Sequence, residues 1–392
     1  MKKIIYITLL IVLPVTGLQS QYGFDPILKS IEINNTTLKA YREKADADKI
    51  GNRTGINLAN PDVEVDYLWG NSSAEGKLDM SVKQTFDFPT AYRYKSQLAD
   101  GKNRQIDMVY EQQRKDILQQ ARLICVEYTY LTKMNEQLVE RRRRSKELAA
   151  AHAKRFELGE IDILEHNKAQ LDMLNMAKAV DMNEVEIKLQ WNELKRLNGG
   201  QPFPDNILDY PAYDLPLDYA EWFERIKDNN PSLLIAQQDI ELSRKQMQLT
   251  KSLNLPKITA GYITEREAGV FSHGMSVGIS IPLWEGRNTV KHQKAQTIAA
   301  QMIYSDSKNQ FQNTLGSQYE KARKLSALLK EYKQILEVTN NYELLKKALD
   351  KGQLSLINYL TELSIYYDTM DKYLETERDY QMAVAELQQW EK

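Results

Sequence analysis

The sequence predicts a mainly α-helical protein with a membrane β-barrel contribution, built from a duplicated unit of helix, β-hairpin and long helical hairpin. Three observations support this fold class. Long stretches rich in Lys, Glu, Gln, Leu and Ala contain almost no proline or glycine, as in long helices. Four short segments alternate apolar and polar residues, as strands do. The two halves of the chain also repeat one order of elements.

Composition excludes several classes of function. Basic and acidic residues nearly cancel, at 52 against 54, so nothing indicates binding to nucleic acid. The single cysteine excludes a disulfide within the chain and a CxxC metal or redox site. The four histidines are scattered, and no catalytic constellation stands out. We therefore expect no enzyme activity, no cofactor and no metal centre.

The N-terminus has the pattern of a signal peptide. Lys2 and Lys3 precede an apolar stretch, Ile4–Val15, and Ser20 offers a small residue for cleavage. The apolar stretch is too short for a membrane-spanning helix, which needs about 20 residues. We therefore assign residues 1–20 to a signal peptide and expect an exported protein.

The remainder of the chain divides into two repeats. At an offset of 195 residues, Asn34–Leu38 matches Asn229–Leu233, and beyond the next loop an offset of 193 carries Gly159 onto Gly352. The predicted boundaries are 21–199 for the first repeat, 200–229 for a proline-rich inter-repeat segment and 230–392 for the second repeat.

Each repeat is expected to begin with a helix and continue into a hairpin of two strands. The strands are predicted over 63–69 and 78–88 in the first repeat, and over 258–262 and 275–281 in the second. Segments of this kind, about ten residues long and apolar on one face only, suit tilted strands of a membrane barrel. Aromatic residues stand near the strand ends: Tyr67, Trp69, Phe88 and Trp284. The alternative is a pair of half-buried hairpins packed on helices.

The membrane interpretation requires an oligomer. Four strands cannot close a barrel, because the smallest membrane barrels have eight. Open strand edges in lipid would leave backbone groups unpaired, at a cost of several kcal/mol each. Three copies would supply twelve strands.

Very long helices are predicted to follow each hairpin. One runs from Ala91 to about Phe156, roughly 100 Å at 1.5 Å per residue. After Gly159 a second helix returns to Asn198, and the second repeat repeats the pattern from Asn288 to Ala348, with its break at Gly352. The expected result is two antiparallel helical hairpins that extend away from the strands.

In this arrangement the chain resembles the TolC family of outer-membrane efflux proteins over essentially all of its mature length. The resemblance depends on the duplicated order of elements, on Asn230–Leu233 and Ile281–Arg287, and on the two breaks, Phe156–Leu164 and Leu349–Ile357. It implies a homotrimer in the cell outer membrane, with a 12-stranded barrel on a 12-helix periplasmic α-barrel.

The resemblance also implies partners at the far end of the helices. The glycine breaks would meet a periplasmic adaptor protein, which is bound to an inner-membrane pump. We therefore predict an adaptor-docking tip at five residues: Leu158, Gly159, Ile161, Gly352 and Leu354. The alternative is that both glycines merely end their helices.

Family members often close the tunnel near this tip with acidic residues six and nine positions beyond the second glycine. Here Asn358 and Thr361 occupy these positions, which puts acidic gating in doubt. The first-repeat equivalents are Glu165 and Lys168. Glu165 and Glu362 are the weaker acidic substitutes, so we predict a constriction that involves Glu165, Asn358, Thr361 and Glu362.

Three other features are expected to be structural. The run Arg141–Arg144 is assigned to a solvated face or to salt bridges between helices. Met173, Met176 and Met182 are assigned to packing rather than to copper, and Cys125 to a packed apolar position.

The leading functional hypothesis is a passive exit duct for drug or metal efflux that takes its energy from a partner pump. Two alternatives stay open. One is the outlet of a type I protein-secretion system, which the sequence does not distinguish from drug or metal efflux. The other is a periplasmic coiled-coil scaffold with soluble hairpins.

Overall fold

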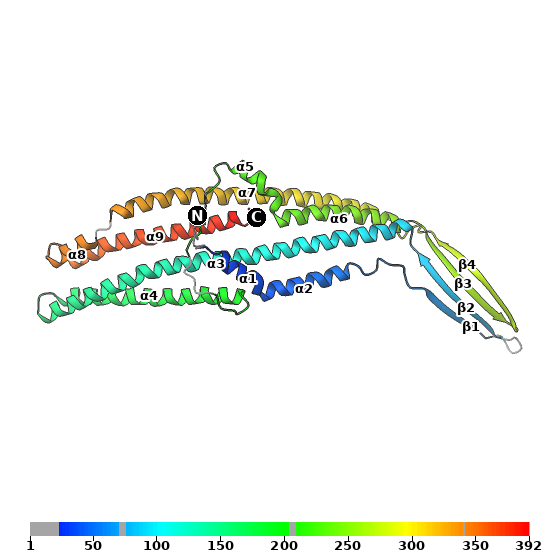
Figure 1. Cartoon of the computed structure of the whole chain (residues 1–392), viewed down its shortest axis with the longest axis horizontal. Helices are drawn as coiled ribbons and strands as arrows, with labels where there is room; N and C mark the ends of the chain where they lie inside the picture. Colours follow the sequence, from blue (N-terminus) through cyan, green and yellow to red (C-terminus); the bar gives the residue numbers. More distant parts are fainter. Residues whose placement is uncertain (1–22, 70–75, 204–208, 340–341, 392) are drawn as a thin grey trace, which may run out of the picture.

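The computed structural model describes residues 23–69, 76–203, 209–339 and 342–391, so the signal-peptide assignment lies outside the described residues. The molecule is elongated, with a sheet at one end and the turns of two helical hairpins at the other (Figure 1). The first half comprises α1 (Asp25–Asn34), α2 (Thr36–Gly51), β1 (Asp62–Leu68), β2 (Lys77–Phe86), α3 (Pro89–Glu157) and α4 (Ile163–Leu197).

The second half runs through a comparable order of elements. It comprises α5 (Tyr219–Ile226), the 3-10 helix η1 (Lys227–Asn229), α6 (Pro231–Leu253), β3 (Lys257–Glu267), β4 (Val270–Ser280), α7 (Thr289–Val338), α8 (Tyr342–Asp350) and α9 (Leu356–Gln388). α5 and η1 fall within the segment that we expect to join the two repeats. The exact repeat boundaries stay a prediction.

The predicted long helix of the first half is confirmed as α3, which has 69 residues. Pro89 occupies its first turn, where a missing N–H costs nothing. Gly101 lies inside the helix, at a position where an added Cβ would approach Leu242 Cδ2 of α6 to 2.7 Å. This glycine therefore permits close packing of α3 against α6 instead of ending the helix.

The prediction of one helix from Asn288 to Ala348 is wrong. α7 ends at Val338, and α8 begins only at Tyr342. Thr339 has a non-helical φ of −107°, and its hydroxyl donates to the Ile335 carbonyl at 2.8 Å. Val338 and Thr339 are both weaker helix formers than Ala or Leu, which explains why α7 ends here.

The four strands form one antiparallel sheet in the order β1-β2-β3-β4. A row of paired residues across all four strands is Val63, Val82, Tyr262 and Met275, and the adjacent row is Asp62, Lys83, Gly261 and Ser276. β3 extends to Glu267, five residues beyond the predicted strand, and β4 begins at Val270, five residues before the predicted one. A two-residue turn of positive φ at Ala268 and Gly269 joins β3 to β4.

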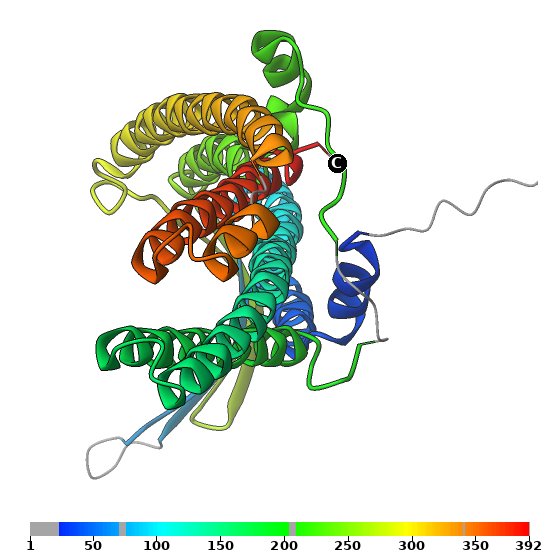
Figure 2. The same ribbon diagram turned by 90° about the vertical axis from the view of Figure 1, so that its left-hand side faces the viewer.

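The helices are arranged as an arc. Away from the sheet, α4 packs on α3, α3 on α9 and α9 on α7, while nearer the sheet α2 packs on α3, and α6 packs between α3 and α7. Seen along its length, the arc has a concave side, and α1 lies on the opposite, convex side (Figure 2). No helix among the described residues combines the length and apolarity needed to cross a membrane.

Buried side chains gather in separate clusters along the bundle. In one of them α1 packs against α3 and α4 around Ala121 and Cys125, both of which are completely buried. In another, Trp222 and Phe223 of α5 pack against Leu315 of α7 and Leu387 of α9. Cys125 is therefore a packed apolar residue, as predicted.

Candidate functional site

The sheet has one apolar face and one charged face, and both are exposed in the single chain. On the apolar face, Met275 is 92% exposed and Val277 is 82% exposed. The charged face carries ion pairs between neighbouring strands, such as Lys83 with Glu64 at 2.9 Å and Lys77 with Glu265 at 2.8 Å. If water contacted both faces of the sheet, these apolar side chains would remain exposed to it. An apolar surface of this size therefore indicates contact with lipid or with another protein surface.

The sheet also has two free edges. Within the described residues, β1 pairs only with β2, and β4 pairs only with β3. Long exposed edges of this kind are templates for pairing with another strand. Aromatic side chains stand at both ends of the sheet: Trp69 packs edge-on against Tyr67 at 5.5 Å between ring centroids, and Trp284 is 77% exposed.

The ends of the two helical hairpins lie close together, at the opposite end of the molecule from the sheet (Figure 1). Gly159 and Gly352 occupy the turns with φ of +71° and +69°. Each glycine is followed three residues later by a helix N-cap. Asp162 accepts a hydrogen bond from the backbone N–H of Glu165, and Ser355 accepts one from that of Asn358. The two turns are therefore built in the same way.

The predicted tip residues surround these turns. Leu158 is 65% exposed, while Ile161 and Leu354 are half-buried. A Cβ at either glycine would meet nothing within 4 Å. The exposed apolar surface extends further than the predicted set, to Ile163, Leu164, Leu344 and Ile357. Leu344 belongs to α8, whose separation from α7 the sequence did not predict.

The predicted constriction residues are not brought together within one chain. Glu165 lies on α4, whereas Asn358, Thr361 and Glu362 lie on α9, and no hydrogen bond or ion pair among the described residues joins the two sets. Glu165 is half-buried and the other three are exposed. The constriction therefore stays a prediction that needs other copies of the chain.

The arginine run links the two hairpins. Arg141 is only 6% exposed, and its guanidinium donates to both carboxylate oxygens of Asp371 on α9, at 2.9 and 2.5 Å. Arg144 stacks over the ring of Tyr342 at 3.6 Å, and Arg143 pairs with Glu140 and Glu147 on its own helix. These contacts match the predicted salt-bridged face.

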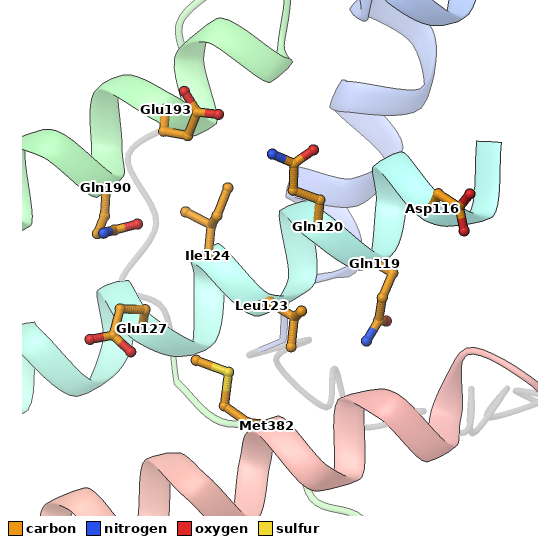
Figure 3. A pocket seen from close by; sticks show the side chains of 9 residues that line it. All are labelled: Asp116, Gln119, Gln120, Leu123, Ile124, Glu127, Gln190, Glu193 and Met382. Atoms are coloured by element: carbon orange, nitrogen blue, oxygen red, sulfur yellow. The ribbon is translucent and has the colours of Figure 1, made fainter. Parts of the chain in front are cut away.

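An open groove of about 540 Å³ lies between α3, α4 and α9, and sequence reasoning missed it (Figure 3). Its lining comprises Asp116, Gln119, Gln120, Leu123, Ile124 and Glu127 of α3, Gln190 and Glu193 of α4, and Met382 of α9. No signal in the sequence joins these three segments, because each looks like the ordinary polar surface of a helix.

Carboxylates and an unpaired amide determine the chemistry of the groove. Burial raises the pKa of Asp116, and burial also raises the pKa of Glu127 despite Arg378 at 3.9 Å. Gln119 is 8% exposed, and its Nε2 has no hydrogen-bond partner among the described residues. In the described part of the chain, no three His, Cys, Asp or Glu side chains are close enough together to hold a metal ion.

Comparisons with solved structures identify the fold. A membrane protein from Pseudomonas aeruginosa superposes with a TM-score of 0.79 at 14% identity, over 93% of this chain and 89% of that one. The CmeC outer membrane channel of Campylobacter jejuni superposes with a TM-score of 0.74 at 14% identity, over 93% of this chain and 85% of the channel chain. The outer membrane protein VceC of Vibrio cholerae superposes with a TM-score of 0.74 at 12% identity, over 94% of this chain and 96% of the VceC chain. The chain therefore has the fold of these outer-membrane channels, as its resemblance to the TolC family implied.

A scan of protein-family models and a search of curated proteins found no match to this sequence.

Proposed function

We propose that this protein is the outer-membrane exit duct of an efflux system, a passive channel without catalytic activity. The observation that carries the proposal is the open four-stranded sheet, apolar on one face and charged on the other, at the end of a long helical arc. In a closed barrel the apolar face contacts lipid and the charged face lines a water-filled lumen. The concave side of the arc continues that lumen into the periplasm.

Exposed apolar side chains at both ends of the arc support assembly from several copies. On α4 they recur at intervals of three, four, seven or eight residues: Leu164, Leu171, Leu174, Met182, Val185 and Leu189. On α7 they include Ile298, Met302, Ile335 and Val338. Such stripes are typical of helices that pack on a further helix. We assign the α4 edge of one copy to the α7 edge of the next, in a trimer of twelve strands.

The glycine turns are the proposed docking surface for a periplasmic adaptor that is bound to an inner-membrane pump. Two similar turns, each with an open position beside the glycine and apolar side chains around it, offer a pair of equivalent contacts. This arrangement favours a partner that inserts its own helical turn between them. Transport energy then comes from the pump.

Membrane fractionation followed by conductance measurement tests the proposal. The full-length protein, expressed in a Gram-negative host, is expected in the outer-membrane fraction, and the purified protein is expected to form discrete channels in planar lipid bilayers. A soluble, elongated periplasmic particle without channel activity would contradict the duct and favour a coiled-coil scaffold.

A further inference from the structure

The groove between α3, α4 and α9 opens on the concave side of the arc. Ala121 and Cys125 of α3 face α1 on the convex side. A helix turns about 100° per residue, so Asp116, Leu123 and Glu127 lie on the opposite face of α3. In the duct that we propose, this face lines the tunnel, which places the groove beside the path of the transported molecule.

Basic side chains in this stretch of α3 have partners of their own. Arg122 donates to Gln119 Oε1 at 3.5 Å. Arg114 pairs with Glu32 of α1 at 2.6 Å, on the convex side. Asp116 has no hydrogen bond or ion pair with the described residues. Among the described residues, Glu127 pairs only with the distant Arg378, which makes a closer pair with Asp379 at 2.9 Å. The third carboxylate of the groove, Glu193, is paired with Arg196 of its own helix at 2.7 Å, so Asp116 and Glu127 are the carboxylates with little compensating charge.

Apolar side chains and the unpaired amide also line the groove. Leu123, Ile124 and Met382 are half-buried, and Met side chains adapt to ligands of different shape. The amide nitrogen of Gln119 points into the space between α3 and α9 (Figure 3). A buried hydrogen-bond donor without an acceptor lowers the stability of the fold. The described residues offer no acceptor for this Nε2, so a bound ligand could provide one.

We propose that the groove binds organic cations that carry an apolar or aromatic body and an oxygen acceptor. The carboxylates attract the positive charge, the apolar side chains contact the body, and Gln119 Nε2 donates to the oxygen. A metal ion does not fit, because the carboxylates surround the groove instead of converging on one point. A volume of about 540 Å³ lies within the usual range for small-molecule sites. This assignment rests on the proposed duct and names a class of cargo for it.

Two dyes with the same xanthene ring and opposite charge test the proposal. Rhodamine 6G is cationic and has an ester carbonyl, whereas fluorescein is anionic. Fluorescence polarisation with the purified full-length protein is expected to show saturable binding of rhodamine 6G and at least about tenfold weaker binding of fluorescein, in line with a charge-assisted contact.

The variant Asp116→Asn/Glu127→Gln removes both charges with little change of shape. It is expected to weaken rhodamine 6G binding about tenfold or more at an unchanged melting temperature. Glu136→Gln is the matched control, because Glu136 is exposed on the Cys125 side of α3, and it is expected to bind as the wild type does. Equal affinity for both dyes, or unchanged binding by the double variant, would overturn the proposal.

Failure of the duct gives a different result. A protein that forms no channels but binds rhodamine 6G through Asp116 and Glu127 would overturn the proposed function, while the groove would still be a binding site for organic cations. A protein that forms channels but shows no saturable dye binding would overturn only the assignment of the groove as a binding site.

Discussion

At the scale of single residues, glycine serves two different purposes in this chain. Gly101 lies inside a helix and allows close approach of another helix, whereas Gly159 and Gly352 adopt positive φ at turns where no neighbouring atom restricts space. Only the second kind leaves room for a partner. The sequence distinguishes the two through the residues that follow, since an N-cap residue comes three positions after each turn glycine.

The double variant Gly159→Val/Gly352→Val is expected to abolish crosslinking to the adaptor, because Val is strained at positive φ and also blocks close approach of a partner backbone. Gly200→Val is the matched control: Gly200 has φ of +80°, is likewise open, and lies at the other end of α4. The measurement compares photo-crosslinking from position 158 with the yield of assembled protein. Equal loss of crosslinking per assembled protein in both variants would remove the docking assignment.

At the scale of elements, the alternation of the strands determines which side chains would face lipid in the proposed barrel. Val277 and Ser276 are neighbours on β4 and point to opposite faces of the sheet. The apolar row that contains Val277 also contains Ala260 and Gln84, so a polar side chain does occur on this face towards the helical end. On the same face of β4, Val277 is adjacent to Met275, whose row with Val63, Val82 and Tyr262 contains no charged side chain, so a charge at Val277 would still fall within the apolar band.

Val277→Arg is expected to lower the yield of protein inserted in the outer membrane, because a charge facing hydrocarbon costs about 2–4 kcal/mol near the midplane. Ser276→Arg places the same side chain on the charged face and is expected to insert nearly normally. Quantitative immunoblots of outer-membrane fractions compare the two. Equal tolerance of both substitutions would mean that this sheet does not lie in a membrane.

Local patterns predicted most of the elements, and contacts between distant segments explain what they missed. The length of α3 and the strands followed from proline-free composition and from period-two alternation. β3 extends past Tyr262 because Thr264 and Glu265 pair with Met80 and Asp79 of β2, and pairing partners are not visible in one segment. The groove was missed for the same reason, since Asp116, Gln190 and Met382 are far apart in the sequence.

At the scale of the whole molecule, a single chain leaves several surfaces without a partner among the described residues. Its sheet has two free edges, its helical arc has apolar side chains at both ends, and the predicted constriction residues do not meet. All three features are resolved together if further copies continue the arc and the sheet into closed rings. Closure by three copies would therefore account for all three features.

Short-range crosslinking between the two sheet edges tests closure most directly. Within one chain β1 and β4 are separated by three strand spacings, about 14 Å, whereas paired edges of neighbouring copies would lie about 5 Å apart. Cysteines replace Val277 on β4 and, in turn, Val63, Val65 or Tyr67 on β1, all on the apolar face. Cys125 will not compete, because burial raises the pKa of its thiol to about 12.

The measurement is the number of chains joined by a bifunctional maleimide with a spacer of less than about 8 Å, well below the separation of the edges within one chain. A barrel closed by three copies predicts a ladder of one, two and three chains for at least one cysteine pair, with no larger species. A ladder that stops at two chains, or membrane-inserted protein that no pair crosslinks, would contradict it.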